Sequence, residues 1–479
     1  MPREDELRRV SCPQLNPNPV GTPSSIIRGL GIFVFNLKTI QQEAVAHFAK
    51  EDFHPLAIKL KGPTPTTIVE RFLRLVTINL LAYTFLVYNN STLTFFNSPY
   101  VAATFFGRSG PLQLAATFGS LALGLAMRPL GGRALGPLGD RLGRKTLTRI
   151  GSVGSFLPLL GIALLPDYGK IGLTAPVAFL ILTALQGFFT GSLSGGINVI
   201  GIESLEERHR GWFSGSGMAV SGTSFLVASG IFYGLIKLVG SQAYAVWGWR
   251  IMFSTSFLIV VFGFLMPESR KFSRSKPSAS SEVFRDFKRN FLFAAALTAI
   301  WGSLAFTAEG LLPDFLVQVD HFGSVQVDHI LIIYSVVTAA SGFAGGALSE
   351  LLGRRATSIL GGVLALGAVP LYLALGGANS FGDAALIVGV LSWLLVFGGG
   401  GIMAYVNECF PTGVRSSGVA LAWNIGFTTA GVSTLLITLL ASRIGSFPVA
   451  EAWAVGVLSV LACVVSLASK ETKGLLEKI

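Results

Sequence analysis

The sequence predicts an all-α, polytopic membrane protein with twelve transmembrane helices in two pseudo-symmetric six-helix bundles. Of its 479 residues, 51% are hydrophobic and only 13% are charged, whereas soluble domains contain roughly 25% charged residues. A bilayer crossing needs about 20 apolar residues, and twelve such runs alternate with polar loops. Three motifs also recur, in the same order, in the two halves of the chain. These observations exclude a soluble enzyme, a coiled coil and a disordered chain.

The apolar runs predict these helices in order: 75–96, 111–131, 146–165, 172–197, 214–236, 247–266, 291–312, 329–349, 356–376, 384–405, 416–441 and 447–468. They divide the chain into an extension (1–74), a first bundle (75–266), a polar and basic linker (267–290), a second bundle (291–468) and a tail (469–479).

Lysine and arginine counts predict the orientation. One set of loops holds only five of the 36 Lys and Arg residues. Because positive residues concentrate in cytoplasmic loops, we expect both termini to be cytoplasmic, or on the equivalent side of an organelle membrane. Which membrane it is stays open.

The extension 1–74 has no hydrophobic region typical of a signal peptide. Its apolar segment 26–37 is too short to cross a bilayer. It could be an interfacial helix, dock a protein partner or fold against the bundle.

The first recurring motif is G-x-x-x-[DE]-x-x-G-R-[KR], at 136–145 and again at 346–355. Its acidic and basic residues are Asp140 and Arg144 in the first copy, and Glu350 and Arg354 in the second. Both copies are predicted to be loops in which glycine allows the flanking helices to approach closely.

The second motif pairs Glu203 with Arg210 and, 205 residues later, Glu408 with Arg415. The third places Glu268 after the sixth helix and Glu471 after the twelfth. Such repetition predicts two parallel repeats related by an axis along the membrane normal.

These motifs resemble those of the major facilitator superfamily over about residues 70–479. Within it, the segments 128–132, 186–188, 249–250 and 266–272 look like the metabolite:proton symporters, and 407–415 is also similar to sugar porters. The resemblance implies transport of a small carboxylate, a betaine or a sugar-like solute.

Acidic residues near helix N-termini and their arginine partners can form a latch that holds one access state closed. The expected gating residues are Asp140, Arg144, Glu203 and Arg210, with Glu350, Arg354, Glu408 and Arg415 as their counterpart. The alternative is that these charges only anchor loops and set topology.

The symporter resemblance implies charged residues in helices 1 and 4, but the matching positions are neutral: Leu81, Thr84, Ala184 and Leu193. Proton coupling needs a titratable group in the cavity. We therefore expect uniport or exchange rather than proton symport by the usual route.

Two ionisable residues stand out near the spans. Arg128 could gate, bind an anion or extend to the interface. Glu309 could be a substitute proton site or a cation contact, or a wet residue at the outer mouth.

Polar and aromatic side chains suit a small organic solute, although they also bond helices together. The candidate substrate-binding residues are Tyr83, Tyr88, Asn89, Gln186, Asn198, Glu309, Tyr334, Trp393 and Asn424.

The predicted function is a secondary transporter that works by alternating access in contact with membrane lipid. The alternative is a transport-inactive structural or sensing subunit of a membrane complex.

The sequence contains no enzyme motif in its required context, and the three cysteines are too dispersed for a metal site. We expect no catalytic residues, no cofactor, no metal and no nucleic-acid partner.

Overall fold

The computed structural model describes residues 68–89, 93–106, 111–269, 285–310, 324–375 and 380–477, together with residues 272, 283 and 316. The chain divides into two compact units, Met1–Thr66 and Thr67–Ile479. The first unit lies outside the described residues, and so does the predicted segment 26–37. The helices named below belong to the second unit.

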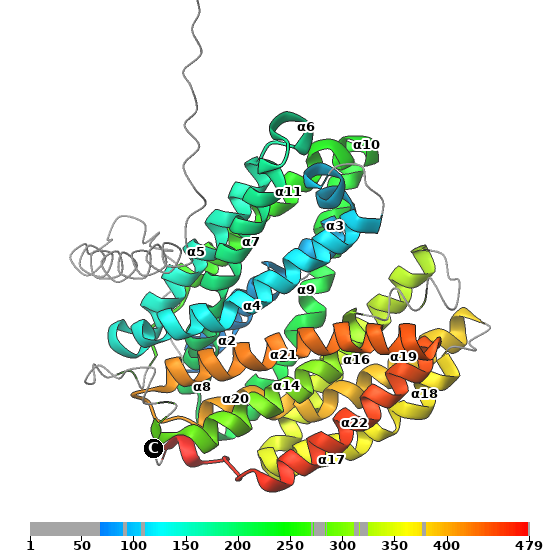
Figure 1. The fold of residues 1–479 in the computed structure, drawn as a ribbon. Helices are drawn as coiled ribbons and strands as arrows, with labels where there is room; N and C mark the ends of the chain where they lie inside the picture. Colours follow the sequence, from blue (N-terminus) through cyan, green and yellow to red (C-terminus); the bar gives the residue numbers. More distant parts are fainter. Residues whose placement is uncertain are drawn as a thin grey trace, which may run out of the picture. The chain divides into compact units, whose positions relative to one another are not determined.

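Six membrane helices form the first bundle within the described chain, some of them built from consecutive pieces (Figure 1). They are α2 (Ile68–Val87), α4 (Pro111–Leu142), α5 (Arg144–Leu164), α7 (Thr174–Leu193) continued by η2 (Ser194–Asn198) and α8 (Val199–Glu203), α9 (Arg210–Val239), and a sixth composed of α10 (Ser241–Ala243), η4 (Tyr244–Gly248), α11 (Trp249–Ser254), η5 (Thr255–Phe257) and α12 (Leu258–Leu265). The connections contain α3 (Leu93–Phe105), α6 (Tyr168–Ile171) and η3 (Glu207–His209).

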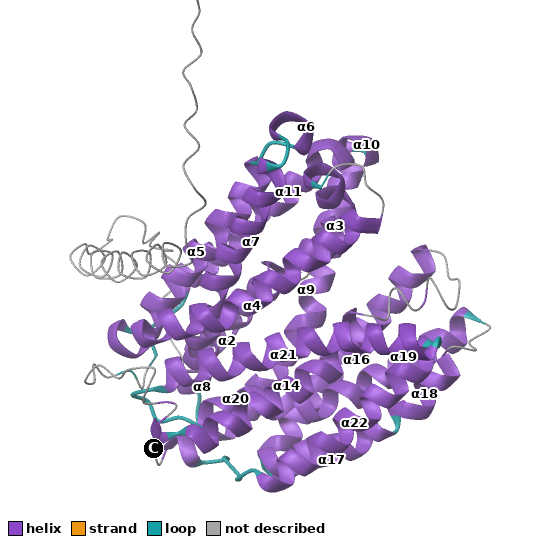
Figure 2. Ribbon diagram, viewed as in Figure 1, coloured by secondary structure: helices purple, strands orange, loops and turns teal. Residues whose placement is uncertain are grey.

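The second bundle repeats this order among the described residues. Its helices are α14 (Lys288–Gly310), α16 (Ser324–Leu352), α17 (Arg354–Leu366) continued by α18 (Ala368–Leu375), α19 (Phe381–Val396) continued by η6 (Phe397–Gly401) and α20 (Ile402–Glu408), α21 (Arg415–Ile444) and α22 (Phe447–Ala468), followed by the short η7 (Leu475–Glu477). Figure 2 shows helices and loops, and no strand, in the described part of the chain.

Ten of the described helices are long and apolar enough to cross a membrane, namely all of the membrane helices except α2 and α4. In α2 the described apolar stretch is Val76–Val87. The outer surface suits hydrocarbon, because side chains such as Leu164 and Leu238 are 74% and 81% exposed. A water-soluble protein rarely exposes so much continuous apolar surface. The chain is therefore all-α and membrane-spanning, as predicted.

The predicted loops 136–145 and 346–355 are wrong in one respect. Helix α4 continues through the first copy to Leu142, and α16 continues through the second copy to Leu352, so only Gly143 and Gly353 interrupt the helices. Their φ angles are 105° and 93°, a region that side chains with a Cβ rarely adopt. The helices continue beyond the predicted spans, and the turn follows at a single glycine.

The first helix also differs from the predicted span 75–96. Helix α2 begins at Ile68 and ends at Val87, and the separate helix α3 begins at Leu93. Residues 90–92, between them, lie outside the described chain.

The two ends of the bundles can be told apart by these motifs. We call the end that carries Gly143 and Gly353 the motif end, and the opposite end the far end. The described C-terminal residues lie at the motif end (Figure 1).

Candidate functional site

Three charged side chains of the first bundle form a buried cluster at the motif end. Arg144 places Nη2 3.7 Å from Asp140 Oδ1 and 3.4 Å from Glu203 Oε1. Each of these side chains is at most 1% exposed. Since a buried charge is costly unless it is paired and hydrogen-bonded, these contacts have to persist while this end stays closed.

The second bundle builds the same arrangement from the second copy of the motifs. Arg354 Nη2 lies 3.2 Å from Glu350 Oε1 and 3.1 Å from Glu408 Oε1. The Arg354 and Glu408 side chains are fully buried. The internal repeat therefore extends from sequence to side-chain geometry.

The third motif caps the helix that follows each single-glycine turn. The carboxylate of Glu268 accepts a hydrogen bond from the Arg144 backbone N–H at 2.9 Å, and Glu471 accepts one from the Arg354 backbone N–H at 2.9 Å. A carboxylate at a helix N-terminus satisfies free N–H groups and interacts favourably with the helix dipole. Sequence reasoning did not assign these two residues to a site, although their repetition was the signal for them.

The residues after these caps bind the second motif. The Ser269 hydroxyl donates to Glu203, and the Thr472 hydroxyl donates to Glu408 at 2.9 Å. All three motifs of each half thus converge on one cluster at the motif end.

The two clusters are joined by a reciprocal pair of helix caps. Asp140 of the first bundle accepts hydrogen bonds from the backbone N–H groups of Ser416 and Ser417 at 2.9 and 3.0 Å, at the start of α21. Glu350 of the second bundle accepts one from the backbone N–H of Gly211, at the start of α9. Each bundle therefore uses its motif carboxylate to cap a helix of the other bundle.

Arg415 adds an ion pair between the bundles, with Nη1 2.6 Å from Glu203 Oε1. Arg144 Nη2 donates to the Thr412 carbonyl at 2.6 Å, again across the bundles. Arg210 donates to the Leu205 carbonyl of its own bundle at 3.2 Å. The eight predicted gating residues therefore all lie at the motif end, with Arg415 bound to the first cluster.

Burial makes these contacts sensitive to charge. Burial raises the pKa of Asp140 to about 6, while the Arg144 guanidinium and the hydrogen bonds from Ser417 and Ser416 lower it. The desolvation cost is thus larger than the gain from these partners. Water that reached Asp140 on opening would return its pKa towards the ordinary value of about 3.9.

Further contacts between the bundles extend from the motif end towards the middle of the helices. Asn424 Nδ2 donates to the Gly191 carbonyl at 2.7 Å, and Thr428 Oγ1 donates to the Leu125 carbonyl at 2.8 Å. The candidate substrate residue Asn424 therefore bonds the two bundles in this state. Figure 1 shows α4 and α21 side by side along this contact.

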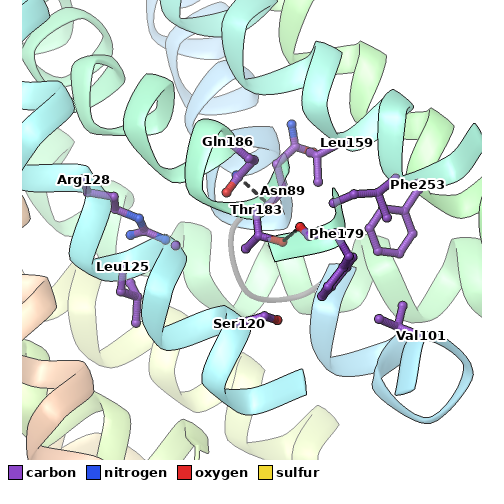
Figure 3. Close-up of a pocket in the computed structure, with 12 residues that line it drawn as sticks. Asn89, Val101, Ser120, Leu125, Arg128, Leu159, Phe179, Thr183, Gln186 and Phe253 are labelled. Atoms are coloured by element: carbon purple, nitrogen blue, oxygen red, sulfur yellow. Dashed lines mark hydrogen bonds between the residues drawn. The ribbon is translucent and has the colours of Figure 1, made fainter. Parts of the chain in front are cut away.

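A pocket lies inside the first bundle (Figure 3). Arg128 on α4 faces it together with Asn89 and the α7 residues Thr183 and Gln186. Arg128 Nε and Asn89 Oδ1 have no hydrogen-bond partner within the described residues. Gln186 Nε2 donates to the Asn89 carbonyl at 3.4 Å. The pocket thus combines one cation with amide groups, so it can accept a carboxylate.

The other substrate candidates of the first bundle lie outside this lining. Tyr83 is buried and interacts electrostatically with Arg128. The Tyr88 hydroxyl is 2.6 Å from Thr255 Oγ1. Asn198 is 1% exposed, and its amide has no hydrogen-bond partner among the residues described.

The remaining candidates belong to the second bundle. Tyr334 lines a small groove where α16 meets α9. Trp393 is 38% exposed and stacks on Phe397. The side chain of Glu309 lies outside the described part of the structure.

Sequence reasoning also missed Glu451 on α22. It is 1% exposed, and neither carboxyl oxygen has a hydrogen-bond partner among the described residues. Its position four residues after the start of an apolar span was the available signal, since ionisable residues inside spans are functional candidates.

Comparison with known proteins agrees with this architecture. The sequence model of the Major Facilitator Superfamily matches residues 80–432. The citrate-proton symporter of Klebsiella pneumoniae is 32% identical, over 71% of this chain and 80% of the symporter. The proline/betaine transporter of Escherichia coli K12 is 26% identical, over 76% of this chain and 77% of that protein.

Solved structures show the same fold. The proton:xylose symporter XylE superposes with a TM-score of 0.67 at 15% identity, covering 85% of this chain and 98% of XylE. The human organic anion transporter MFSD10 superposes with a TM-score of 0.61 at 14% identity, covering 83% and 99%.

The fold and the duplicated motif clusters define a multi-pass membrane transporter. The chain belongs to the Major Facilitator Superfamily. It is a transporter rather than an enzyme, it lies in lipid, and it moves a small-molecule solute, as the sequence predicted.

Proposed function

We propose that this transporter moves a small organic carboxylate by alternating access. The observation that carries the proposal is the Arg128 pocket, in which a guanidinium faces the amides of Asn89 and Gln186. A guanidinium binds a carboxylate through charge-assisted hydrogen bonds. Neutral solutes such as sugars would leave this cation without a counter-charge.

We propose that the transporter is here in the conformation whose motif end is closed. The reciprocal caps of Asp140 and Glu350 and the Glu203–Arg415 ion pair support closure of this end. With both termini on the cytoplasmic side, as the charge distribution predicts, this is the outward-facing state. Movement to the inward-facing state would break all three connections together.

The proposed mode is uniport or exchange. Leu81, Thr84, Ala184 and Leu193 occupy the positions at which the symporter resemblance implies charge, and none of them can titrate. The 32% identical relative is a citrate-proton symporter. The proposal therefore shares the class of solute, a carboxylate, with this relative, but it does not share the coupling to protons.

The test is uptake by the purified full chain in liposomes, with labelled citrate, glycine betaine and xylose as probes. We expect citrate uptake, and we expect Arg128→Gln to reduce it about tenfold or more, since a charge-assisted contact contributes roughly 1.5–3 kcal/mol. Arg128→Lys should retain part of the activity. Arg133→Gln is the matched control, because Arg133 lies on the same helix and is exposed.

Uptake of betaine or xylose without citrate would refute the carboxylate proposal. Failure of a folded, monodisperse protein to move any of the three probes would favour the alternative of a structural or sensing subunit. Co-purification with other membrane proteins in fixed proportion would support that alternative further.

A further inference from the structure

Glu451 has an environment that disfavours its charge. Its carboxyl is 1% exposed on α22, and both oxygens lack a hydrogen-bond partner within the described chain. An isolated carboxylate in such a setting carries a large desolvation cost, and a buried acid escapes that cost by binding a proton.

The polar group found near Glu451 is a phenol rather than a cation. The phenol of Tyr372 on α18 interacts electrostatically with Glu451 and with Tyr334 of α16, and it lies beside Thr307 of α14. The Tyr372 side chain is also buried, at 2% exposed. The Glu451 carboxyl and the Tyr372 phenol thus lie within electrostatic range of each other in the second bundle.

No described cation neutralises this carboxyl. Helix α22 packs against α14, α17, α18 and α21. The charged residues that these helices carry are Lys288, Arg289 and Glu309 on α14, Arg354 and Arg355 on α17, and Arg415 and Arg443 on α21. Arg354 and Arg415 pair with glutamates at the motif end, and Arg443 is exposed at the far end. The Glu309 side chain is outside the described residues.

We propose that Glu451 is a proton-binding site that holds the far-end junction of α14, α18 and α22 together. The protonated acid is compatible with the dry packing around Tyr372. Loss of the proton places an uncompensated charge there, and the junction must then admit water. Acid therefore stabilises the closed junction, and alkali opens it. The site lies in the second bundle, away from the Arg128 pocket, so this proposal does not depend on the identity of the solute.

The experiment is hydrogen–deuterium exchange of the full chain in detergent micelles or nanodiscs. The segments to compare are 300–307 and 447–458, in the parent and in Glu451→Gln, each at about pH 6 and about pH 9. Comparison of the two proteins at the same pH removes the intrinsic pH dependence of exchange and the titration of distant groups such as Asp140.

We expect equal exchange at the lower pH, because the glutamine amide imitates the protonated acid. At the higher pH the parent should exchange severalfold faster than Glu451→Gln in these two segments and in α18, and not elsewhere. Glu451→Asp should still respond to pH. Glu206→Gln, which changes an exposed carboxylate, should behave as the parent does.

Equal exchange of parent and Glu451→Gln at both pH values would overturn the proposal. Faster exchange of Glu451→Gln at both values would also overturn it, since the carboxyl would then be a fixed packing element rather than a proton site.

Discussion

Glu203 of the first bundle binds Arg415 of the second at 2.6 Å, between side chains that are both fully buried. The two residues come from different copies of the same motif. The ion pair is thus made between the halves rather than within one half. Because a single buried charge is far more costly than a pair, separation of the bundles at the motif end requires water to reach both residues.

The first prediction concerns this ion pair. Glu203→Gln leaves Arg415 buried without its partner, which should cost the closed state roughly 3 kcal/mol. The motif end should then open more often. Cys409 is buried and free at this end, so its maleimide labelling rate reports opening once Cys12 and Cys463 are replaced by serine. We expect about a hundredfold faster labelling.

The control for this prediction is Glu206→Gln. Glu206 pairs with Arg208, but both side chains are more than 70% exposed, and exposed pairs contribute at most about 1 kcal/mol. Its labelling rate should match the parent's. An unchanged rate in Glu203→Gln would show that the ion pair does not control opening.

The second prediction concerns Asp140. Charge reversal by Asp140→Lys removes the cap on α21 and places a cation beside Arg144 and a helix N-terminus, both unfavourable. We expect solute uptake to fall much further than the yield of folded, monodisperse protein. Equal loss of uptake and yield would mean that Asp140 serves folding rather than gating.

The third prediction concerns pH. In the closed state the pKa of Asp140 is raised to about 6, whereas in the open, hydrated state it should be about 3.9. The closed state therefore binds the proton more tightly, and acidification from about pH 7 to about pH 5 should favour closure. Cys409 labelling, normalised to a model thiol, should slow over this range. In an Asp140→Asn variant, the part of the pH dependence of Cys409 labelling that comes from Asp140 should be absent.

The fourth prediction concerns the single-glycine turns. Gly143→Ala places a Cβ at a φ of 105° and against the carboxylate of Glu268. Gly240→Ala is the matched control, because its φ is 85° and no atom lies within 4 Å of the added Cβ. Backbone strain of about 1–2 kcal/mol is common to both. Thermal unfolding should show a clearly larger loss of Tm for Gly143→Ala. Equal losses of Tm would exclude an additional cost from contact between the new Cβ and the Glu268 carboxylate.

The fifth prediction concerns coupling. An imposed pH gradient should not drive accumulation of citrate, because the four positions that the symporter resemblance would charge are neutral. Uptake should follow the citrate gradient in the parent and in Glu309→Gln. Accumulation that disappears in Glu309→Gln would assign a relocated proton site to that residue. Accumulation that survives the substitution would show either that the helix alignments are wrong or that Glu451 supplies the coupling proton site.

The sequence by itself determined the membrane class, the helices and the duplication. These follow from properties that are local along the chain: runs of about 20 apolar residues, lysine and arginine in alternate loops, and motifs at fixed spacing. Helix ends were less accurate. Hydropathy reports where an apolar run ends, whereas α4 continues beyond its apolar run to Leu142.

Only the tertiary structure decided which charges meet. The sequence placed Glu203, Glu408 and Arg415 in repeated motifs, but their spacing allows either intra-bundle or inter-bundle pairs. The packing of α8 and α21 brings Arg415 to Glu203, while Glu408 binds Arg354 of its own bundle. Burial of Glu451 was likewise decided by packing, because its neighbour Tyr372 is 79 residues away along the chain. Such contacts depend on how helix surfaces fit in three dimensions, which no periodicity along a single helix records.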